Sequence, residues 1–510
     1  MIREGREFGS SFHESADAVI IGSGCGGGAA AKTLAESGLR VVVLEEGGYY
    51  TPDRFQPTEE FAYQHLYRGR GAQATEDLAV TVLQGRCVGG SSTVNWLTSL
   101  RTPEFVLEAW RARHGVTGMT PREMEPYFER VEKYLNVHPE PDGNHSPNNR
   151  IILDGAARLG WRSRANGRNA RDCVGAGVCG LGCPFDAKRS VDRTYIPDAV
   201  DAGAELLADC RADSIEIRSA VKRVRGTVLD RETRRERLPF TVDAGIVVIS
   251  AGAIHTPVIL RRSNLEDRSG QLGKNLTFHL TTAVIGTYDR VIYAAGGRPQ
   301  SAYCDEFLNR NGDEGGFWIE SVPVHPALAA MALPGFGPGH RAMMRRFPTL
   351  GATIALVKET DSAGSVRVND AGRPTISYAV GPKDLAYLKE GVAAMCRLQF
   401  AAGAKSVRTL HARTTEFTAP EEIEEGLRNA SWGTNEIALF SAHPLGSCRM
   451  GGDPARSVVD SHGQMHDVKG LFVVDGSVIP TSLGVNPQLT ILAIAEKNAE
   501  WIAANFRSLA

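Results

Sequence analysis

The sequence lacks a long apolar run, a strong net charge and a disulfide framework. No stretch of eighteen apolar residues occurs in its 510 residues, which excludes a membrane-spanning helix. The 57 basic and 59 acidic side chains leave a net charge of −2, which argues against a protein that wraps nucleic acid. With 42% hydrophobic and 23% charged residues, the composition predicts a folded globular protein. The length predicts two domains.

The cysteines and the N-terminal residues indicate a reducing compartment. The nine cysteines are scattered and odd in number. Residues 1–16 are polar and lack the apolar core of a signal peptide, and Arg3 and Arg6 are not the adjacent pair of a twin-arginine signal. We therefore expect a cytoplasmic protein with mostly free thiols. The sequence does not address oligomeric state. The apolar stretch 326–344 is suited to touch a bilayer surface, but it lacks a clear basic face in the sequence.

A glycine-rich turn between a strand and a helix is the first positive signal. Residues 17–21 predict a buried strand, residues 28–37 a helix of small side chains, and residues 40–45 a second strand. The turn carries the pattern G-x-G-x-x-G at Gly22, Gly24 and Gly27. In that pattern the glycines allow the tight turn, the approach of a pyrophosphate and close helix–strand packing. A dinucleotide site is therefore predicted.

An acidic residue supports this prediction. Glu45 ends the second strand, where its carboxylate can accept hydrogen bonds from ribose hydroxyls. The pattern by itself does not distinguish FAD from NAD. Further along, residues 103–134 predict helix, and the charged residues 230–237 predict a solvated turn before a strand at 245–250.

Four separated segments resemble the glucose–methanol–choline (GMC) family of flavin oxidoreductases. They are the N-terminal unit ending at Gly47, residues 85–95, residues 250–276, and residues 441–487. They occur in the family's order from one end of the chain to the other. The closest likeness is to long-chain alcohol oxidases and cholesterol oxidase-like members.

The resemblance implies FAD and an α/β fold of two interleaved domains. One is a Rossmann-like FAD-binding domain, and the other is a substrate domain built on an antiparallel sheet with helices. The implied FAD-binding domain is discontinuous and comprises residues 15–100, 190–285 and 440–510. The implied substrate-binding domain comprises residues 101–189 and 286–439.

Small residues and helix ends mark the expected FAD contacts. Gly89 and Gly90 supply backbone donors where a phosphate or a flat ring must come close. The last helix opens near residue 488, and its N-terminus would direct positive potential at the flavin. The expected contacts are Gly22, Gly24, Gly27, Glu45, Arg86, Gly89, Gly90, Ser91, Asn95, Ala212, Ala251, Asp475, Gly476, Pro487 and Gln488. Some relatives attach FAD covalently to a histidine near this position, where the present chain has Val94. We therefore expect non-covalent FAD here.

The resemblance also implies a catalytic pair, His443 and Asn486. A neutral imidazole is suited to take the hydroxyl proton of an alcohol while the α-hydride moves to flavin N5. An amide cannot act as a base, so Asn486 would orient the alcohol by hydrogen bonding. His279 recurs in family-like sequences, and we interpret it as structural.

A cysteine-rich loop leaves two interpretations open. Cys173, Cys179 and Cys183 lie within eleven residues, separated by glycines and followed by proline. This loop resembles an iron–sulfur ligand loop in some bacterial FAD-dependent glucose dehydrogenases, and such a cluster would carry electrons to an acceptor. The simpler interpretation, which we favour, is free thiols or one disulfide in a loop beside the active site.

An apolar stretch gives the expected substrate contacts. Phe317, Trp318, Met331 and Phe336 fall in a region that covers the substrate pocket in the family. Methionine-rich apolar walls adapt to hydrophobic ligands, although core packing gives the same composition. We therefore expect a lipophilic alcohol, either long-chain, sterol-like or aromatic.

Three functions remain to be distinguished. The leading one is an FAD-dependent alcohol oxidase or dehydrogenase, reoxidised by oxygen or another acceptor. The second is a sugar or glycoside dehydrogenase with an iron–sulfur cluster and an electron-accepting partner. The third is a flavin-binding protein without turnover. The C-terminal flavin segments disfavour an NAD-dependent dehydrogenase.

Overall fold

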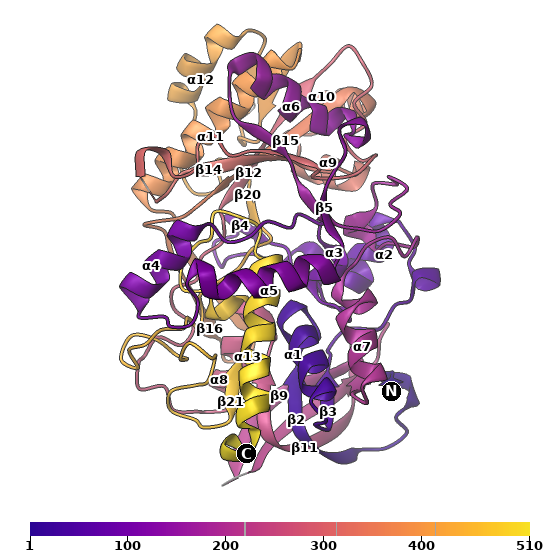
Figure 1. Ribbon diagram of the computed structural model, residues 1–510. Helices are drawn as coiled ribbons and strands as arrows, with labels where there is room; N and C mark the ends of the chain where they lie inside the picture. Colours follow the sequence, from indigo (N-terminus) through magenta and orange to yellow (C-terminus); the bar gives the residue numbers. More distant parts are fainter. Residues whose placement is uncertain (219–220, 313, 414) are drawn as a thin grey trace.

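The computed structural model stacks two sheets, each covered by helices (Figure 1). It describes residues 1–218, 221–312, 314–413 and 415–510. The lower half in Figure 1 holds both termini, helices α1 and α13 and the strands β2, β3 and β11. The upper half holds α6, α11 and α12 around β12, β14 and β15. The mixed α/β fold class is confirmed.

The first sheet has the order β1-β8-β3-β2-β11-β10-β9, with β21 paired to β11. Its central strands run parallel, whereas β9 and β10 are antiparallel to their neighbours. The strand bounds are β1 Ile2–Arg3, β2 Phe12–Ile21, β3 Val41–Leu44, β8 Glu205–Leu207, β9 Cys210–Arg218, β10 Val221–Leu229, β11 Glu236–Ile249 and β21 Leu471–Val473. Strands from three distant parts of the chain thus meet in one sheet.

Helix α1 (Cys25–Glu36) packs closely because its first turns carry no bulky side chain. Residues 26–31 are glycine and alanine, and all are buried. They lie against α13 (Gln488–Leu509) and α7 (Tyr195–Asp201), next to strands whose Val and Ile side chains are fully buried. The predicted strand–turn–helix–strand unit is therefore present, with slightly different bounds.

The second sheet has the order β19-β18-β12-β15-β14-β13-β6, and β20 joins β12 to β4. Its central pairs are antiparallel. The strand bounds are β4 Val80–Val82, β6 Ser163–Ala165, β12 Thr281–Thr287, β13 Ala302–Cys304, β14 Phe317–Ser321, β15 Leu350–Val357, β18 Ser406–Thr409, β19 Glu416–Phe417 and β20 Leu439–Ser441. One face packs on α6 and α11, and the other faces the first sheet's half of the molecule.

The remaining helices and two small two-stranded sheets complete the fold. The helix bounds are α2 Glu59–Phe61, α3 Ser91–Val94, α4 Glu104–His114, α5 Pro121–Tyr134, α6 Pro147–Leu159, α8 Gly252–Arg262, α9 Pro326–Ala332, α10 Gly337–Arg345, α11 Pro382–Ala401 and α12 Ile423–Asn429. Strands β5 Val137–Pro139 and β7 Gly167–Asn169 form one antiparallel pair, and β16 Ala363–Val368 and β17 Pro374–Ala379 form a hairpin.

Two local predictions can be compared directly. The helical stretch at 103–134 is two helices, because Gly115 adopts a left-handed conformation (φ 64°) and ends α4. A capping box between Thr120 and Glu123 then begins α5. The charged residues 230–237 include the turn between β10 and β11, as predicted. In the described part of the chain no helix is both long and apolar enough to span a membrane.

Candidate functional site

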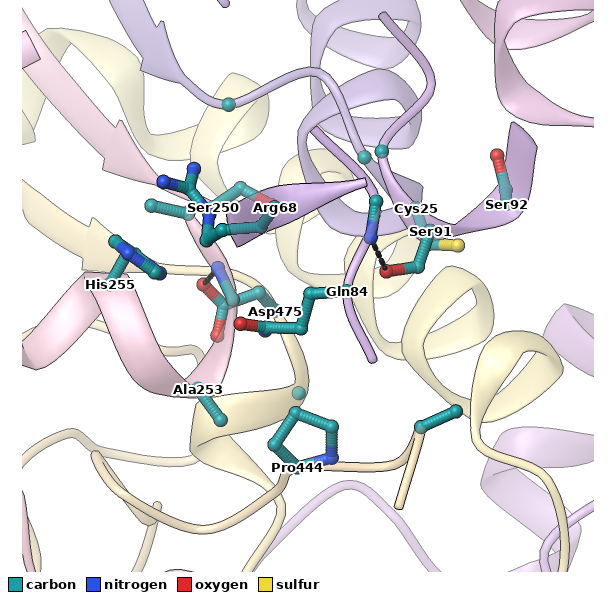
Figure 2. Close-up of a pocket in the computed structure, with 18 of the residues that line it drawn as sticks. Cys25, Arg68, Gln84, Ser91, Ser92, Ser250, Ala253, His255, Pro444 and Asp475 are labelled. Carbon is teal, nitrogen blue, oxygen red and sulfur yellow. Dashed lines mark hydrogen bonds between the residues drawn. The ribbon is translucent and has the colours of Figure 1, made fainter. Parts of the chain in front are cut away.

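A cavity of about 430 Å³ lies between the two halves of the molecule. It extends from the α1 N-terminus and the end of β3 to the underside of the second sheet. Figure 2 shows Gln84 beside Asp475, with His255 and Arg68 further along the same cavity. Segments far apart in the sequence therefore contribute side chains to one elongated site.

The glycine turn forms one wall of the cavity and packs directly against neighbouring backbone. Gly22 has φ +97°, and a Cβ there would lie 2.3 Å from the Ser250 carbonyl oxygen. A Cβ on Gly26 would lie 1.7 Å from the Val474 carbonyl oxygen. Gly24 caps α1 and lines the cavity, so the free amides of the first helical turn face it. Gly27 instead packs against Gly22 and does not line the cavity.

Glu45 lines the cavity at the end of β3, where the sequence predicted it. Its Oε2 accepts hydrogen bonds from the Ser23 amide (3.0 Å) and hydroxyl (2.7 Å), and its Oε1 accepts one from the Gly47 amide (2.8 Å). Burial raises the pKa of Glu45 despite these bonds. The carboxylate is thus held in place by the turn it adjoins.

The sequence did not predict the ion pairs that Glu46, next to Glu45, forms with two arginines. Glu46 also lines the cavity, and it pairs with Arg68 (2.7 Å) and Arg86 (3.2 Å). Arg86 is therefore behind Glu46 rather than in the cavity lining, whereas Arg68 is part of the lining. The doubled acid at the strand end was the available signal, but nothing local identifies Arg68 as its partner.

The segment that follows β4 covers the glycine turn. Gly90 (φ +56°) would place a Cβ 2.9 Å from the Gly24 Cα, so the two backbones touch. Gly89 lies one layer back, and its amide donates to the Ser23 hydroxyl (3.2 Å). Ser91 and Asn95 line the cavity. The Asn95 amide group donates to the Gln488 side-chain oxygen, which joins this segment to the start of α13.

The remaining expected contacts also lie in the cavity lining. They are Ala212, Ala251, Asp475, Gly476, Pro487 and Gln488. Asp475 is fixed by the Gly252 amide (2.9 Å), the Thr256 hydroxyl (2.5 Å) and the Ser477 amide (2.7 Å). Helix α13 begins at Gln488, so its N-terminus also faces the site.

Several buried polar atoms in this lining have no partner within the protein. They are Gln84 Oε1, His255 Nδ1, Asn486 Oδ1 and Gln488 Nε2. A buried polar atom without a partner is costly, and a ligand with many donors and acceptors would satisfy these. Together with the glycine cradle and the helix N-termini, they fit an elongated, anionic, hydrogen-bonding cofactor such as FAD.

At the other end of the cavity His443 and Asn486 both line the wall. His443 Nδ1 lies 3.1 Å from His279 Nδ1, with the two rings nearly perpendicular at 83°. Burial lowers the pKa of His443 to about 4, so the ring is neutral near pH 7. The sequence-predicted pair is thus together, and His279 is a third member.

His279 determines where the proton of His443 resides. Its Nε2 accepts hydrogen bonds from the amides of Leu483 (2.9 Å) and Gly484 (3.3 Å). The proton of the neutral His279 ring is therefore on Nδ1, which donates to His443 Nδ1. Neutral His443 consequently carries its own proton on Nε2. His279 is held in the left-handed region (φ 53°) by Glu359, whose Oε2 accepts from its amide (3.1 Å).

Asn486 belongs to a second buried network. Its Nδ2 donates to Glu320 Oε2 (3.3 Å), which also accepts from Gln300 Nε2 (2.9 Å). This leaves Asn486 Oδ1 free as an acceptor. Glu320 is fully buried, and burial raises its pKa to about 7. Gln300 lines the cavity, and the sequence analysis named neither residue.

The four expected substrate residues lie outside the cavity lining. Phe317 points into the core beneath α11, stacked on Phe307 at 4.6 Å between ring centroids. Trp318, its neighbour on β14, points to the opposite face and packs edge-on against His279. Met331 and Phe336 are on the surface, 68% and 93% exposed. On the side of the second sheet the apolar lining includes Trp96, Ile354, Leu356 and Phe440.

The cysteine-rich loop shows no grouping of metal-ligating side chains among the described residues. All nine cysteines are unpaired, and among the described residues no three His, Cys, Asp or Glu side chains are grouped so as to hold a metal ion. The loop is instead braced by the buried Lys188, whose Nζ donates to the carbonyls of Thr93 (2.9 Å), Asn95 (2.7 Å) and Cys179 (3.1 Å). The structure thus gives the iron–sulfur interpretation of Cys173, Cys179 and Cys183 no support.

Known families and relatives match almost the whole chain. Two family models described as GMC oxidoreductase match residues 63–281 and 360–495, and one described as FAD binding domain matches residues 17–51. An uncharacterized GMC-type oxidoreductase of Mycobacterium tuberculosis is 36% identical over 94% of this chain and 74% of its own. A long-chain-alcohol oxidase of Arabidopsis thaliana is 31% identical over 94% of this chain and 66% of its own.

Solved structures agree on the fold. Pyridoxine 4-oxidase from Mesorbium loti superposes with a TM-score of 0.71 at 20% identity, covering 95% of this chain and 98% of that one. A formate oxidase variant from Aspergillus oryzae also gives 0.71, at 16% identity, covering 98% and 100%. At these identities the likeness concerns the fold alone.

Proposed function

Because the chain belongs to the GMC oxidoreductase family, we propose that it oxidises a lipophilic alcohol to an aldehyde or ketone with non-covalently bound FAD. The observation that carries the substrate class is the apolar wall of Trp96, Ile354, Leu356 and Phe440 in the same cavity as His443. The printed names of the long-chain-alcohol oxidase relatives support the same class.

Residues at one end of the cavity would bind the cofactor, and residues at the other end would bind the alcohol. The α1 N-terminus, Gly90 and Glu45 would hold the nucleotide part of FAD, and the α13 N-terminus would face the flavin. When bound, FAD supplies the acceptor for the hydride of the carbinol carbon. His443 Nε2–H donates to the alcohol oxygen, and Asn486 Oδ1 accepts from the alcohol hydroxyl.

That His443 accepts the hydroxyl proton of the alcohol stays a prediction. It needs an unprotonated Nε2, whereas the hydrogen bonds of His279 favour a proton there. A role as hydrogen-bond donor needs no such change. We therefore assign His443 the donor role in the resting site. As the hydride leaves the carbinol carbon the hydroxyl proton must leave too, and His443 Nε2 accepts it once the His279–His443 pair has exchanged tautomers.

An anaerobic spectrum tests the proposed function. We expect flavin absorbance near 450 nm in the purified protein and its loss on addition of a long-chain primary alcohol. A yellow protein that no alcohol bleaches would contradict the proposal, and bleaching by sugars but not by long-chain alcohols would contradict the substrate class.

A further inference from the structure

Helix α9 and the loop that joins it to α10 present large apolar side chains to solvent. The surface formed by α9, α10 and this loop, residues 326–347, is called here the α9–α10 surface, and it lies at the upper right of Figure 1. Phe336, in the connecting loop, is 93% exposed, and Met331 is 68% exposed. Buried Leu333 and Ala329 anchor the segment from beneath.

A neighbouring segment extends this apolar area. Val291 and Tyr293 are 66% and 50% exposed. The Tyr293 ring lies 6.1 Å from that of Phe347, directly after α10, and its amide donates to the Pro348 carbonyl (3.0 Å). Single exposed apolar residues are ordinary, but several on touching segments indicate an interaction surface.

The same surface is positively charged. No aspartate or glutamate occurs between residues 321 and 358. Arg341, Arg345 and Arg346 are exposed, and no carboxylate of the described residues forms an ion pair with them. The acids nearby are engaged elsewhere: Glu59 accepts from the first amides of α9, and Asp289 pairs with Lys405. Exposed apolar side chains flanked by free arginines match an anionic lipid surface.

The surface is joined to the cavity by one apolar cluster. Met343, Met344 and Phe347 pack against buried residues that include Trp318, Ile354 and Leu356. Trp96 and Phe440 pack against the same cluster. Ile354, Leu356, Trp96 and Phe440 also line the cavity, whereas no residue of 326–347 does, so the surface and the site are joined through packed side chains.

We propose that the α9–α10 surface docks the enzyme on an anionic lipid bilayer, a phase that also holds lipophilic alcohols. This inference rests on the proposed function for the nature of the substrate but not for the docking itself. The occupant is a lipid surface rather than a second copy of the chain, since free arginines on both copies would repel each other across a symmetric interface.

Vesicle binding of the FAD-loaded enzyme tests the docking. We expect co-sedimentation with vesicles of phosphatidylcholine and phosphatidylglycerol, weakened by salt and by omission of phosphatidylglycerol. Replacing Arg341, Arg345 and Arg346 together by Gln should weaken binding by about 100-fold, at roughly fivefold per arginine. Phe336→Ser should weaken it separately.

Matched controls and a separate activity readout keep the outcomes distinct. Leu78→Ser, at a 74% exposed residue outside this surface, and Arg122→Gln, at another exposed arginine, should leave vesicle binding unchanged. Absence of binding, or equal loss in these controls, would overturn the docking, as would a dimer that Phe336→Ser dissociates. Flavin bleaching by a water-soluble alcohol without vesicles tests the proposed function independently.

Discussion

His443 is the residue on which the chemistry depends most directly. Its Nδ1 is committed to His279, and its Nε2 is the nitrogen left for a substrate. As a hydrogen-bond donor to the alcohol, His443 carries a proton on Nε2, whereas as a base it must lack that proton. Variants that keep or remove an N–H at the position of Nε2 therefore distinguish the two roles.

His443→Ala should abolish alcohol-dependent flavin reduction while FAD stays bound. His443→Gln keeps an N–H near the position of Nε2 but cannot take a proton. If His443 is a donor, the Gln variant should keep activity within about tenfold of the wild type, because a neutral hydrogen bond is worth about 1 kcal/mol. Rapid-reaction reduction of the flavin measures this, and a Gln variant as inactive as the Ala variant would support the base role.

Glu320 positions Asn486 through its ionisation. As a carboxylate it accepts from Asn486 Nδ2, so Oδ1 faces the cavity. When protonated it can donate to that oxygen and favour the reversed amide. Since burial raises the pKa of Glu320 to about 7, kcat/KM should rise as the pH passes through about 7.

Glu320→Gln should remove this rise and leave a flat profile near the low-pH level, with FAD affinity unchanged. The pH dependence of kcat/KM in both proteins is the measurement. A variant that is merely less active but keeps the wild-type profile would contradict a positioning role for Glu320.

At the scale of elements, the site depends on how closely α1 approaches the strands. The carbonyl of Val474, at the end of β21, occupies the space where a Cβ of Gly26 would lie. This contact joins the helix that begins after the glycine turn to a strand more than 400 residues later. The cradle at the α1 N-terminus therefore needs a glycine at a position that the G-x-G-x-x-G pattern leaves unspecified.

Gly26→Ala should destabilise the protein by about 2–3 kcal/mol and weaken FAD binding, because the helix must move away from β21. Urea unfolding and FAD titration of the apoprotein measure the two effects. Gly9→Ala is the control, since a Cβ there meets nothing within 4 Å. Unchanged stability in the Gly26 variant would show that the helix shifts without cost.

At the scale of the whole molecule, two buried carboxyl groups connect stability to pH. Burial raises the pKa of both Glu320 and Glu359 to about 7, above the usual value near 4.5. The folded state therefore binds protons more tightly than the unfolded state between these values. Each group lowers the free energy of unfolding as pH rises from about 4.5 through about 7, by roughly 3 kcal/mol.

Glu320→Gln should flatten this part of the stability profile, since the amide does not titrate. The free energy of unfolding from urea titrations at pH 5 and pH 8 is the measurement. The variant should gain stability relative to the wild type at pH 8 and little at pH 5. A gain confined to pH 5 would contradict the direction of the pKa shift.

Local patterns in the sequence determined the cofactor end of the site. The glycine turn and Glu45 follow from short-range spacing, because one strand, one turn and one helix build that wall. The fold class followed from the family resemblance. His443 and Asn486 were identified by family motifs. The tertiary structure decided which residues surround them: His279, Glu320 and Gln300 reach the pair from strands and loops more than 150 residues away. It also decided that Phe317 lies in the core and Phe336 in solvent, since side-chain direction depends on which partner covers each face.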